Sequence, residues 1–433
     1  MILPKLLSKK KFAIYGLGTT GSSVIHYFKK NNFKDFFIWD DNKKIRNNFK
    51  KKINLKEFSK KLKEVDFIIL SPGINIKKAK FRKQLMKNKH KIITDLDLFF
   101  MSGVKNKTIV VTGSNGKSTT CKIIEHMLRK SNIDSQLGGN IGTPVLSLRK
   151  RKKSIFVIEA SSYQLAYSKF VKPTYAIILN ISNDHLDWHG SMNNYVNSKM
   201  KIFSLQDKKG FALLNDNKLI KKLKKKGFSS KLKLVSIKPY KKIQRSIENS
   251  LLNSGANEKN MCFVYALSKI LRIKDSLFIK SLKSFKGLHH RHEIFYKKRN
   301  VKFINDSKAT SFEASKFALM NNENIFWIVG GLPKMKDKFY FKNIKKNIIK
   351  AYIVGKNVNF FKNELKKNVN FEISKTLKRA LIQIFKKIKK LNYNKKITVL
   401  LSPASASFDQ YRNFEERGNN FKKLVKLYAN KSL

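Results

Sequence analysis

The segment TIVVTGSNGKSTTCKIIEHML, from Thr108 to Leu128, constrains the fold of this chain more than any other part of it. A short β-branched run enters a glycine-containing loop, and an amphipathic helix leaves the loop. This order of elements points backbone N–H groups and a helix N-terminus at one place, which favours the binding of a phosphate chain. The alternative interpretation is a chance strand–turn–helix with a solvated lysine.

The loop itself carries side chains that a nucleoside triphosphate needs. Lys117 would place a positive charge on the β- and γ-phosphates, and the Ser118 hydroxyl would bind Mg²⁺. Val111 stands where the full G-x-x-x-x-G-K-S string has its first glycine, so the loop is the compressed T-G-x-x-G-K-S. The residues predicted to bind ATP here are Gly113, Ser114, Asn115, Gly116, Lys117, Ser118 and Thr119.

Short apolar strands alternate with amphipathic, Lys-faced helices along nearly the whole chain. Continuous apolar strands separated by helices indicate parallel sheets covered on both faces. A chain of 433 residues is long enough for two or three domains. We therefore expect an α/β fold with domain boundaries near residues 100 and 287. The predicted strands are Phe12 to Tyr15, Phe36 to Trp39, Phe67 to Leu70, Ile109 to Val111, Ile155 to Ile158, Tyr175 to Leu179, Phe211 to Leu214, Ile325 to Val329, Ala351 to Val354 and Ile397 to Leu400.

The formal net charge of +66 has two interpretations. A basic chain can bind nucleic acid or an anionic membrane, because basic surfaces attract phosphates. Alternatively, Lys and Asn have accumulated wherever any solvated side chain serves. A nucleic-acid module would concentrate its charge in one segment with exposed aromatic residues, so the spread of basic clusters favours the second interpretation. The clusters are Lys9 to Lys11, Lys50 to Lys52, Arg149 to Lys153 and Lys221 to Lys226.

The two cysteines and the apolar runs bear on the compartment. Cys121 and Cys262 lie far apart without metal-ligand spacing, which excludes a disulfide scaffold and fits a reducing cytoplasm. The N-terminus lacks the apolar core of a signal peptide, and no apolar run approaches the roughly 20 residues of a membrane span. We expect a cytoplasmic protein with no membrane insertion and no specific nucleic-acid partner.

Two further polar side chains follow predicted strands. Glu159 ends the strand Ile155 to Ile158, and His185 follows the strand Tyr175 to Leu179. Ligands bind at the carboxyl ends of strands in open α/β sheets, and a carboxylate there could hold Mg²⁺ beside Ser118. Taken alone, Glu159 is equally well explained as a helix cap or surface residue, and His185 as a structural histidine.

A second glycine-rich loop, GLGTTG from Gly16 to Gly21, follows the first predicted strand. The acidic pair Asp40 and Asp41 ends the next strand about 20 residues later, which is the arrangement of a dinucleotide-binding fold. A dehydrogenase is therefore an alternative function. Against it, nothing downstream supplies a hydride-transfer site, whereas a complete ATP loop is present.

Strings that extend from about residue 11 to residue 418 resemble, in order, the motifs of the Mur ligase family. The resemblance implies a Rossmann-like domain for a UDP substrate (residues 1–100), a P-loop-type ATPase domain (101–287) and a Rossmann-like amino-acid-binding domain (288–433). Besides the shortened phosphate loop, the strings are EASSYQ (Glu159 to Gln164), NISNDHLD (Asn180 to Asp187), GLHHRHE (Gly287 to Glu293), NDSKAT (Asn305 to Thr310) and LSPASASFDQ (Leu401 to Gln410).

The resemblance also implies roles for individual residues. Lys199 matches the family's carbamylated lysine, in which CO₂ turns the amine into a carboxylate-like metal ligand; without the resemblance it is one solvated lysine among many. Ala256 stands where the family's nucleotide-contacting string has a histidine, and Ser405 where cysteine is common. The implied ATP-binding residues beyond the loop are Asn257, Asn260, Arg291 and Asp306, and the implied metal ligands are Ser118, Glu159, His185 and Lys199. The residues implied to bind the UDP substrate are Gly18, Thr19, Thr20, Asp40, Asp41, Ser71, Gly73 and Asn140, and those implied to bind the amino acid are Lys308, Thr310, Lys334, Ser407 and Phe414. The implied catalytic residues are Lys117, His185, Lys199 and Arg291.

The two C-terminal strings, NDSKAT and LSPASASFDQ, resemble those of the family member that adds D-glutamate. The resemblance thus implies that ATP and Mg²⁺ activate UDP-N-acetylmuramoyl-L-alanine as an acyl phosphate, which D-glutamate attacks, in peptidoglycan precursor synthesis. It implies domain closure that excludes water, and a monomer. The alternatives are a sister ligase that adds another amino acid, and a basic nucleic-acid-binding ATPase.

Overall fold

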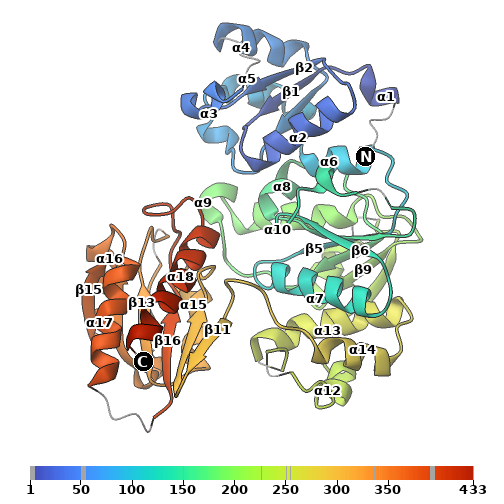
Figure 1. Ribbon diagram of the computed structural model, residues 1–433. Helices are drawn as coiled ribbons and strands as arrows, with labels where there is room; N and C mark the ends of the chain where they lie inside the picture. The colour runs from blue at the N-terminus through green and yellow to red at the C-terminus, as the bar shows by residue number, and fades with distance from the viewer. Residues whose placement is uncertain are drawn as a thin grey trace. The chain divides into compact units, whose positions relative to one another are not determined.

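The computed structural model describes residues 5–49, 55–149, 151–225, 227–249, 251–253, 255–334, 337–340, 342–390 and 395–432. These residues form three β-sheets flanked by helices, in two compact units, Met1–Phe285 and Lys286–Leu433 (Figure 1). The expected α/β class is confirmed. The functional boundaries predicted near residues 100 and 287 stay predictions. Residues 50–52, 150 and 226 of the basic clusters lie outside the described residues.

The N-terminal sheet of the first unit has four parallel strands in the order β2-β1-β3-β4. All four residues of β1 are buried, which explains why this strand is apolar without alternation. An added Cβ at Gly21, in α2, would lie 1.9 Å from the Gly16 carbonyl oxygen, so this glycine lets the helix pack directly on the end of β1. The elements are α1 (Lys5–Ser8), β1 (Phe12–Tyr15), α2 (Thr19–Lys30), β2 (Phe36–Trp39), α3 (Lys43–Asn47), α4 (Leu55–Glu64), β3 (Phe67–Leu70), η1 (Ile76–Lys78), α5 (Arg82–Lys87), η2 (Lys89–Lys91), β4 (Ile92–Ile93) and α6 (Asp95–Met101).

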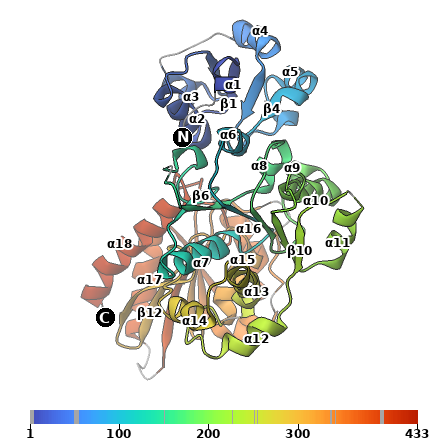
Figure 2. The same cartoon turned by 90° about the vertical axis from the view of Figure 1, so that its right-hand side faces the viewer.

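The central sheet of the same unit has six parallel strands in the order β10-β9-β8-β5-β7-β6. Helix α7 packs against α13 and α14, and these three helices lie together in Figure 2. Helix α8 packs against α10. The elements are β5 (Thr108–Thr112), α7 (Lys117–Lys130), β6 (Ser135–Gly139), η3 (Val145–Ser147), β7 (Ile155–Glu159), α8 (Ser162–Tyr167), β8 (Tyr175–Ile178), α9 (Leu186–His189), α10 (Met192–Met200), η4 (Lys201–Phe203), β9 (Phe211–Leu214), α11 (Asn217–Lys224), β10 (Lys231–Leu234), α12 (Lys238–Gln244), α13 (Gly255–Ile270) and α14 (Asp275–Lys283).

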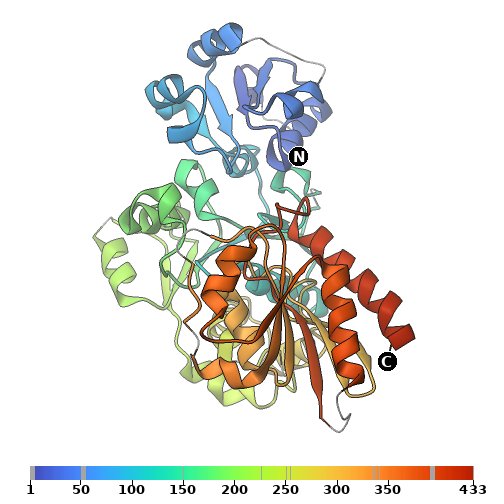
Figure 3. The same cartoon turned by 90° about the vertical axis from the view of Figure 1, so that its left-hand side faces the viewer.

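The second unit is one six-stranded sheet, in the order β11-β12-β16-β13-β14-β15, with helices on both faces (Figure 3). One hydrophobic cluster packs α17 and α18 on the sheet, and another packs α15 and α16 on it. The elements are β11 (Glu293–Lys298), β12 (Val301–Asn305), α15 (Phe312–Met320), β13 (Ile325–Val329), η5 (Lys342–Asn347), β14 (Ile348–Val354), α16 (Val358–Leu365), β15 (Phe371–Lys375), α17 (Leu377–Lys389), β16 (Ile397–Leu401) and α18 (Phe414–Ser432).

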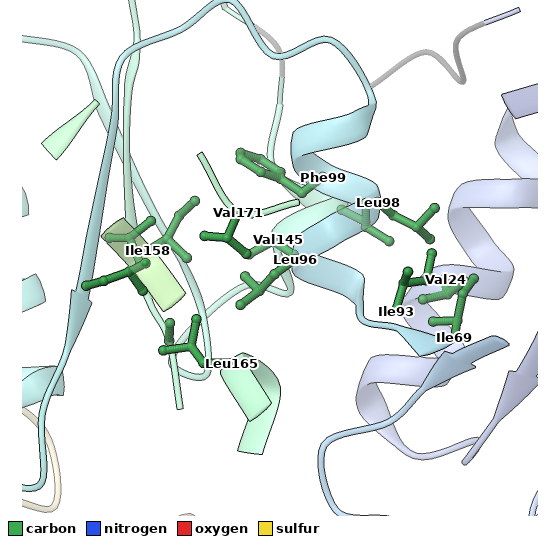
Figure 4. Close-up of a cluster of buried hydrophobic side chains, with 14 of the residues drawn as sticks. Val24, Ile69, Ile93, Leu96, Leu98, Phe99, Val145, Ile158, Leu165 and Val171 are labelled. Atoms are coloured by element: carbon green, nitrogen blue, oxygen red, sulfur yellow. The ribbon is translucent and has the colours of Figure 1, made fainter. Parts of the chain in front are cut away.

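Helix α6 joins the two sheets of the first unit. Leu96, Leu98 and Phe99 are fully buried in a hydrophobic cluster that includes residues from both sheets (Figure 4). The Asp97 carboxylate accepts backbone N–H bonds from Thr94 at 2.8 Å and Phe170 at 2.7 Å. Because these N–H groups replace the water that the buried carboxylate has lost, Asp97 stabilises the start of α6 and its attachment to the segment that contains Phe170.

The sequence-based strands agree with the structure best in the interior of the sheets. Those predicted as Phe12 to Tyr15, Phe36 to Trp39 and Phe67 to Leu70 coincide with β1, β2 and β3. The predicted strands lacked all four edge strands of the two six-stranded sheets, which are β6, β10, β11 and β15, and they also lacked the interior strand β12 and the short strand β4. The expectation of wholly parallel sheets was wrong for β11, which runs antiparallel to β12. The connection from Lys298 to Val301 is too short for a parallel crossover.

None of the described helices has both the length and the hydropathy that a membrane-spanning helix requires. Cys121 and Cys262 are free and buried.

The close approach at Gly21 can be tested with a matched pair of glycine variants. Gly21→Ala should destabilise the protein by about 1–3 kcal/mol, because the new Cβ overlaps the Gly16 carbonyl. Gly18→Ala should cost less than about 1 kcal/mol, because nothing lies within 4 Å of the added Cβ. Thermal and urea unfolding of the full chain would measure both. Equal losses for the two variants would contradict the packing argument.

Candidate active site

The phosphate loop between β5 and α7 is held in place by Asn180, which follows β8. The Asn115 backbone N–H donates to Asn180 Oδ1 at 2.9 Å, and Asn180 Nδ2 donates to the Asn115 carbonyl at 3.0 Å. The Ser114 N–H donates to the Asn180 carbonyl at 3.0 Å. From the sequence, Asn180 was noticed only as the first residue of a motif, without a role of its own. Because β8 pairs directly with β5, this amide can brace the loop from the neighbouring strand end.

Lys117 and Ser118, the two side chains predicted from the sequence to act on the phosphates and on Mg²⁺, both lie at the phosphate loop. Lys117 Nζ donates to the carbonyl oxygens of Gly113 and Ser114, both at 2.9 Å, so its ammonium group lies over the loop. Ser118 is buried at the N-terminus of α7. This places a cation, a hydroxyl and a helix N-terminus around one loop, which is suited to a polyphosphate.

Helix α13 brings Asn260 against the phosphate loop. Gly116 has φ +84°, and a Cβ there would lie 2.4 Å from Asn260 Oδ1. Asn260 Nδ2 donates to Asn257 Oδ1 at 3.4 Å, and Asn257 Nδ2 donates to the Leu251 carbonyl at 2.7 Å. The two asparagines predicted to contact the nucleotide thus lie beside its predicted phosphate loop. The side chain of Ala256 lies outside the described residues.

Glu159 ends β7 next to the loop strand and is 1% exposed. Its Oε1 accepts a hydrogen bond from Asn140 Nδ2 at 2.7 Å. Its Oε2 is buried and has no hydrogen-bond partner among the described residues. A buried carboxylate oxygen without a partner is costly unless a cation or a donor meets it. Asn140, which was predicted to bind the UDP substrate, therefore hydrogen-bonds to Glu159, the predicted metal ligand. The other carboxylate oxygen of Glu159 remains available for a cation.

Lys199, on α10, is 1% exposed and lies against the same loop, so the interpretation of it as a surface lysine was wrong. Its Nζ donates to the Gly113 carbonyl at 2.8 Å and lies 4.5 Å from the centre of the Tyr195 ring. Burial, followed by the charge of Lys117, lowers the pKa of Lys199 to about 6. At neutral pH the amine is then largely uncharged, and an uncharged amine is the form that adds CO₂.

His185 lies close to an acidic residue in an aromatic surrounding. It has φ +53°, its Nε2 is 3.2 Å from Asp184 Oδ2, and its ring is 4.7 Å from that of Tyr163. Among the described residues, no group of three or more His, Cys, Asp or Glu side chains could hold a metal ion. A Mg²⁺ site completed by substrate phosphates does not need such a group, because Mg²⁺ is commonly held by one or two carboxylates and phosphate oxygens.

The acidic pair at the end of β2 is engaged by the protein's own donors. Asp40 Oδ2 accepts from the Leu17 N–H at 2.8 Å, which fixes the glycine loop. Asp41 accepts from Tyr15 Oη at 2.7 Å and from Trp39 Nε1 at 2.9 Å. In a dinucleotide-binding fold the acid at this place binds the ribose hydroxyls. The engagement of both carboxylates bears in the same way on a dehydrogenase and on the UDP role predicted for Asp40 and Asp41, and that role stays a prediction.

The other residues predicted for the UDP substrate lie around the same glycine loop. Ser71, after β3, donates from Oγ to the Gly16 carbonyl at 2.7 Å. Gly18 and Thr19 are exposed, and Thr20 is half-exposed. An added Cβ would meet nothing within 4 Å at Gly18 or Gly73, so both positions have room beside them.

Loops at the carboxyl ends of β12, β13 and β16 carry the residues predicted for the amino acid. Lys308 Nζ lies 4.8 Å from the Phe414 ring, at the start of α18. Leu332 and Ala406 exchange two backbone hydrogen bonds of 2.9 Å, which places two of these loops side by side. Of the remaining predicted residues, Thr310 is half-exposed, Lys334 is exposed and Ser407 is buried.

Asp306, predicted as an ATP contact, is buried among these loops. Its Oδ2 accepts from Ser402 Oγ at 2.7 Å and its Oδ1 from the His292 N–H at 3.0 Å. Burial raises the pKa of Asp306 to about 7, against the opposing effect of the Ser402 hydrogen bond and the Arg291 charge. Arg291, in the loop before β11, is half-buried near this carboxyl group.

Taken together, the fold and the loop define a P-loop-type ATP-using α/β protein, with its phosphate loop at the carboxyl end of a parallel strand. Residues 111–274 match the Mur ligase middle domain, and residues 10–94 match the MurD-like N-terminal domain of Mur ligases. The chain belongs to the Mur ligase family.

Two relatives and two solved structures illustrate the similarity. The UDP-N-acetylmuramoylalanine–D-glutamate ligase of Rickettsia prowazekii is 35% identical over 97% of this chain and 98% of its own length. The ligase of the same name from Buchnera aphidicola is 36% identical over 96% of this chain and 98% of its own length. The fold also matches UDP-N-acetylmuramate-alanine ligase MurC of Thermotoga maritima, with a TM-score of 0.56, 16% identity and coverage of 98% of this chain and 100% of that one. The structure of MurF ligase of the same organism in complex with ADP matches with a TM-score of 0.56 and 15% identity. The match covers 98% of this chain and 100% of that one.

The contact between Gly116 and Asn260 leads to a prediction for nucleotide binding. Gly116→Ala should weaken ATP binding by at least about tenfold, because the added Cβ displaces Asn260 and distorts the N–H groups that face the phosphates. Isothermal titration calorimetry would measure the affinity. The matched control is Gly103→Ala, which has a similar φ of +69° and nothing within 4 Å of its Cβ, and which should bind ATP like the wild type. Unchanged ATP affinity in Gly116→Ala would contradict the site.

Proposed function

We propose that this chain uses ATP to join D-glutamate to UDP-N-acetylmuramoyl-L-alanine, a step of peptidoglycan precursor synthesis. The observation that carries the proposal is the phosphate loop, with Lys117 above it and Glu159 and the buried Lys199 beside it. Relatives at 31–36% identity over nearly the whole chain bear the name of this ligase. Both free cysteines fit a reducing cytoplasm, where we propose that the protein acts as a monomer.

The reaction has two chemical steps. A carboxylate oxygen of UDP-N-acetylmuramoyl-L-alanine attacks the γ-phosphorus of ATP, and ADP leaves with the electron pair of the cleaved P–O bond. The amine of D-glutamate then attacks the acyl phosphate, and the tetrahedral intermediate expels phosphate while the nitrogen loses a proton. Lys117 and Arg291 offset charge on the phosphates, since electrostatic stabilisation is the main contribution of a protein to phosphoryl transfer.

The residues present fit Mg²⁺. The Oε2 of Glu159, at the end of β7, has no hydrogen-bond partner among the described residues, and the buried Ser118 lies in the first turn of α7; both are oxygen ligands of the kind that Mg²⁺ takes. His185 and a carbamylated Lys199 complete the set that we propose. Carbamylation forms a C–N bond between the neutral amine and CO₂ and releases a proton from the nitrogen, so an uncharged amine becomes an anion. When bound, Mg²⁺ would offset negative charge on the phosphates of ATP.

We assign each substrate to one part of the chain. The UDP group binds in residues 1–100, at the glycine loop and the Ser71 turn, with Asn140 reaching it from the central domain. ATP binds in residues 101–287, and D-glutamate in residues 288–433. The residues proposed to bind D-glutamate are Lys308, Thr310, Lys334, Ser407 and Phe414, and the cationic, hydroxyl and aromatic groups among them suit an amino acid with two carboxylates.

The test of this function is phosphate release with UDP-N-acetylmuramoyl-L-alanine and a panel of amino acids. Release should require D-glutamate and should be lost in Lys117→Ala, because the loop loses its charge on the transferred phosphate. Circular dichroism would confirm that this variant folds. Equal release with another amino acid would indicate a sister ligase, and turnover stimulated by RNA but indifferent to D-glutamate would indicate a nucleic-acid-binding ATPase.

Gly18→Val tests which nucleotide the N-terminal loop binds. The structure has open space at this position, so the valine should not disturb folding but should occupy space beside the loop. KM for the UDP substrate should rise by about tenfold or more, whereas KM for ATP should change by less than about twofold. Tight NADH binding by the wild type in a fluorescence titration, without binding of the UDP substrate, would overturn the assignment.

Lys199→Ala tests the carbamate. Activity should fall by at least about a hundredfold, and acetate or formate should restore part of it by filling the vacated space with a carboxylate. Removal of CO₂ should slow the wild type. The control is Lys201→Ala, which removes a partly buried lysine two residues away and should show no response to acetate. A Lys199→Ala enzyme near wild-type activity would remove Lys199 from the site.

A further inference from the structure

Arg417 is a buried arginine of the second unit that the mechanism above does not use. It is 2% exposed and lies on the apolar side of α18, together with the buried Phe421, Val425 and Ala429. Burial is the main reason that its pKa falls to about 10. Burying a guanidinium costs several kcal/mol unless hydrogen bonds replace its water. Its hydrogen-bond partners therefore indicate what the side chain holds together.

The guanidinium of Arg417 binds main-chain and hydroxyl oxygens and not a carboxylate. Its Nε donates to Ser307 Oγ at 3.0 Å, and its Nη2 donates to the carbonyls of Ser307 at 2.8 Å and Ser405 at 2.9 Å. A longer contact of 3.4 Å joins Nη1 to the Ala406 carbonyl. In the part of the chain that the structure describes, Arg417 forms no ion pair within 4 Å, and Asp409 acts on it at longer range.

These contacts fasten two loops at one edge of the sheet, and a third loop, which Leu332 joins to Ala406 by backbone hydrogen bonds, lies against the guanidinium. Ser307 follows β12, and Ser405 follows β16, its parallel neighbour. The third loop follows β13, the other neighbour of β16, and a Cβ on its Gly331 would lie 3.1 Å from Arg417 Nη1. Ser307 Oγ also donates to the Phe414 carbonyl at 2.9 Å, which attaches the start of α18 to the same assembly.

We propose that Arg417 is a positioning residue for D-glutamate, which sets the spacing of the three loops without contacting the substrate. The inference rests on the proposed function. Every residue that we assign to D-glutamate lies on one of these loops or at the start of α18, within three positions of Ser307, Gly331, Ser405 or Arg417 itself. A lysine could not replace Arg417, because a single ammonium lacks the planar fork that reaches both Ser307 and Ser405.

The experiment compares three full-length variants by KM for each substrate. Arg417→Ala should raise KM for D-glutamate by about tenfold or more and leave KM for ATP and for UDP-N-acetylmuramoyl-L-alanine within about twofold. Arg417→Lys should raise KM for D-glutamate by at least about fivefold. Arg412→Ala, which removes an exposed arginine from the same segment, should leave all three values unchanged.

Chemical rescue separates positioning from a general loss of folding. Millimolar guanidinium chloride should lower KM for D-glutamate in Arg417→Ala, while sodium chloride at the same concentration should not. The same addition should leave Lys334→Ala unrescued, because that variant lacks a group assigned to the substrate.

Several results would overturn the proposal. One is a KM for D-glutamate within about twofold of wild type in Arg417→Lys. Another is an equal rise of KM for all three substrates in either variant. If Arg417→Ala does not fold, Arg417→Lys decides the question, and failure of both to fold would make the role purely structural. A wild type that does not use D-glutamate would instead refute the proposed function, so the two failures are distinguishable.

Discussion

The parallel pairing of β5 with β7 and β8 is the constraint on which the rest of the active site depends. In register, Val111 lies opposite Glu159, and Thr112 lies opposite Ile178. Because the three strands point the same way, the phosphate loop, the Glu159 carboxylate and the Asn180 amide all emerge at one edge of the sheet. Residues more than 60 positions apart in the sequence, such as Asn115 and Asn180, can then hydrogen-bond directly. A shift of one residue in either pair would turn these side chains to the other face.

At this edge two lysine side chains donate to one carbonyl oxygen. Lys117 and Lys199 both donate to the Gly113 carbonyl, at 2.9 and 2.8 Å. The shift of the Lys199 pKa from 10.5 to about 6 corresponds to a penalty on the order of 6 kcal/mol for its charged form. The site thus favours a neutral amine at Lys199. Conversion to a carbamate would then introduce a negative charge next to Lys117, which would attract both that ammonium group and a bound Mg²⁺.

The sequence predicted the elements whose environment is uniform and failed where partners come from distant parts of the chain. Interior strands such as Phe12 to Tyr15 are apolar throughout, whereas the edge strand Lys231–Leu234 has polar residues at alternate positions and resembles a loop. The phosphate loop was predictable because its residues are contiguous. The roles of Asn180 and Arg417 were not, since their partners are main-chain groups on other loops, which carry no side-chain signature. Arg417 does have one local signal, a charged residue on the apolar stripe of a helix.

The composition of the chain makes its buried acids informative. Only 28 residues are Asp or Glu, against 94 Lys and Arg, so acids have been retained sparingly. A solvated position tolerates replacement of an acid by Lys or Asn, but a buried carboxylate that accepts backbone N–H bonds does not, because an ammonium would face the same donors. Asp40 holds the glycine loop and Asp97 holds α6 in this way, while one oxygen of Glu159 has no hydrogen-bond partner in the part of the chain that the structure describes. That difference points to Glu159 as the buried acid whose partner is a ligand, and it supports the assignment of the metal site independently of any family motif. The buried acids among the described residues are Asp40, Asp95, Asp97, Glu125, Glu159 and Asp306.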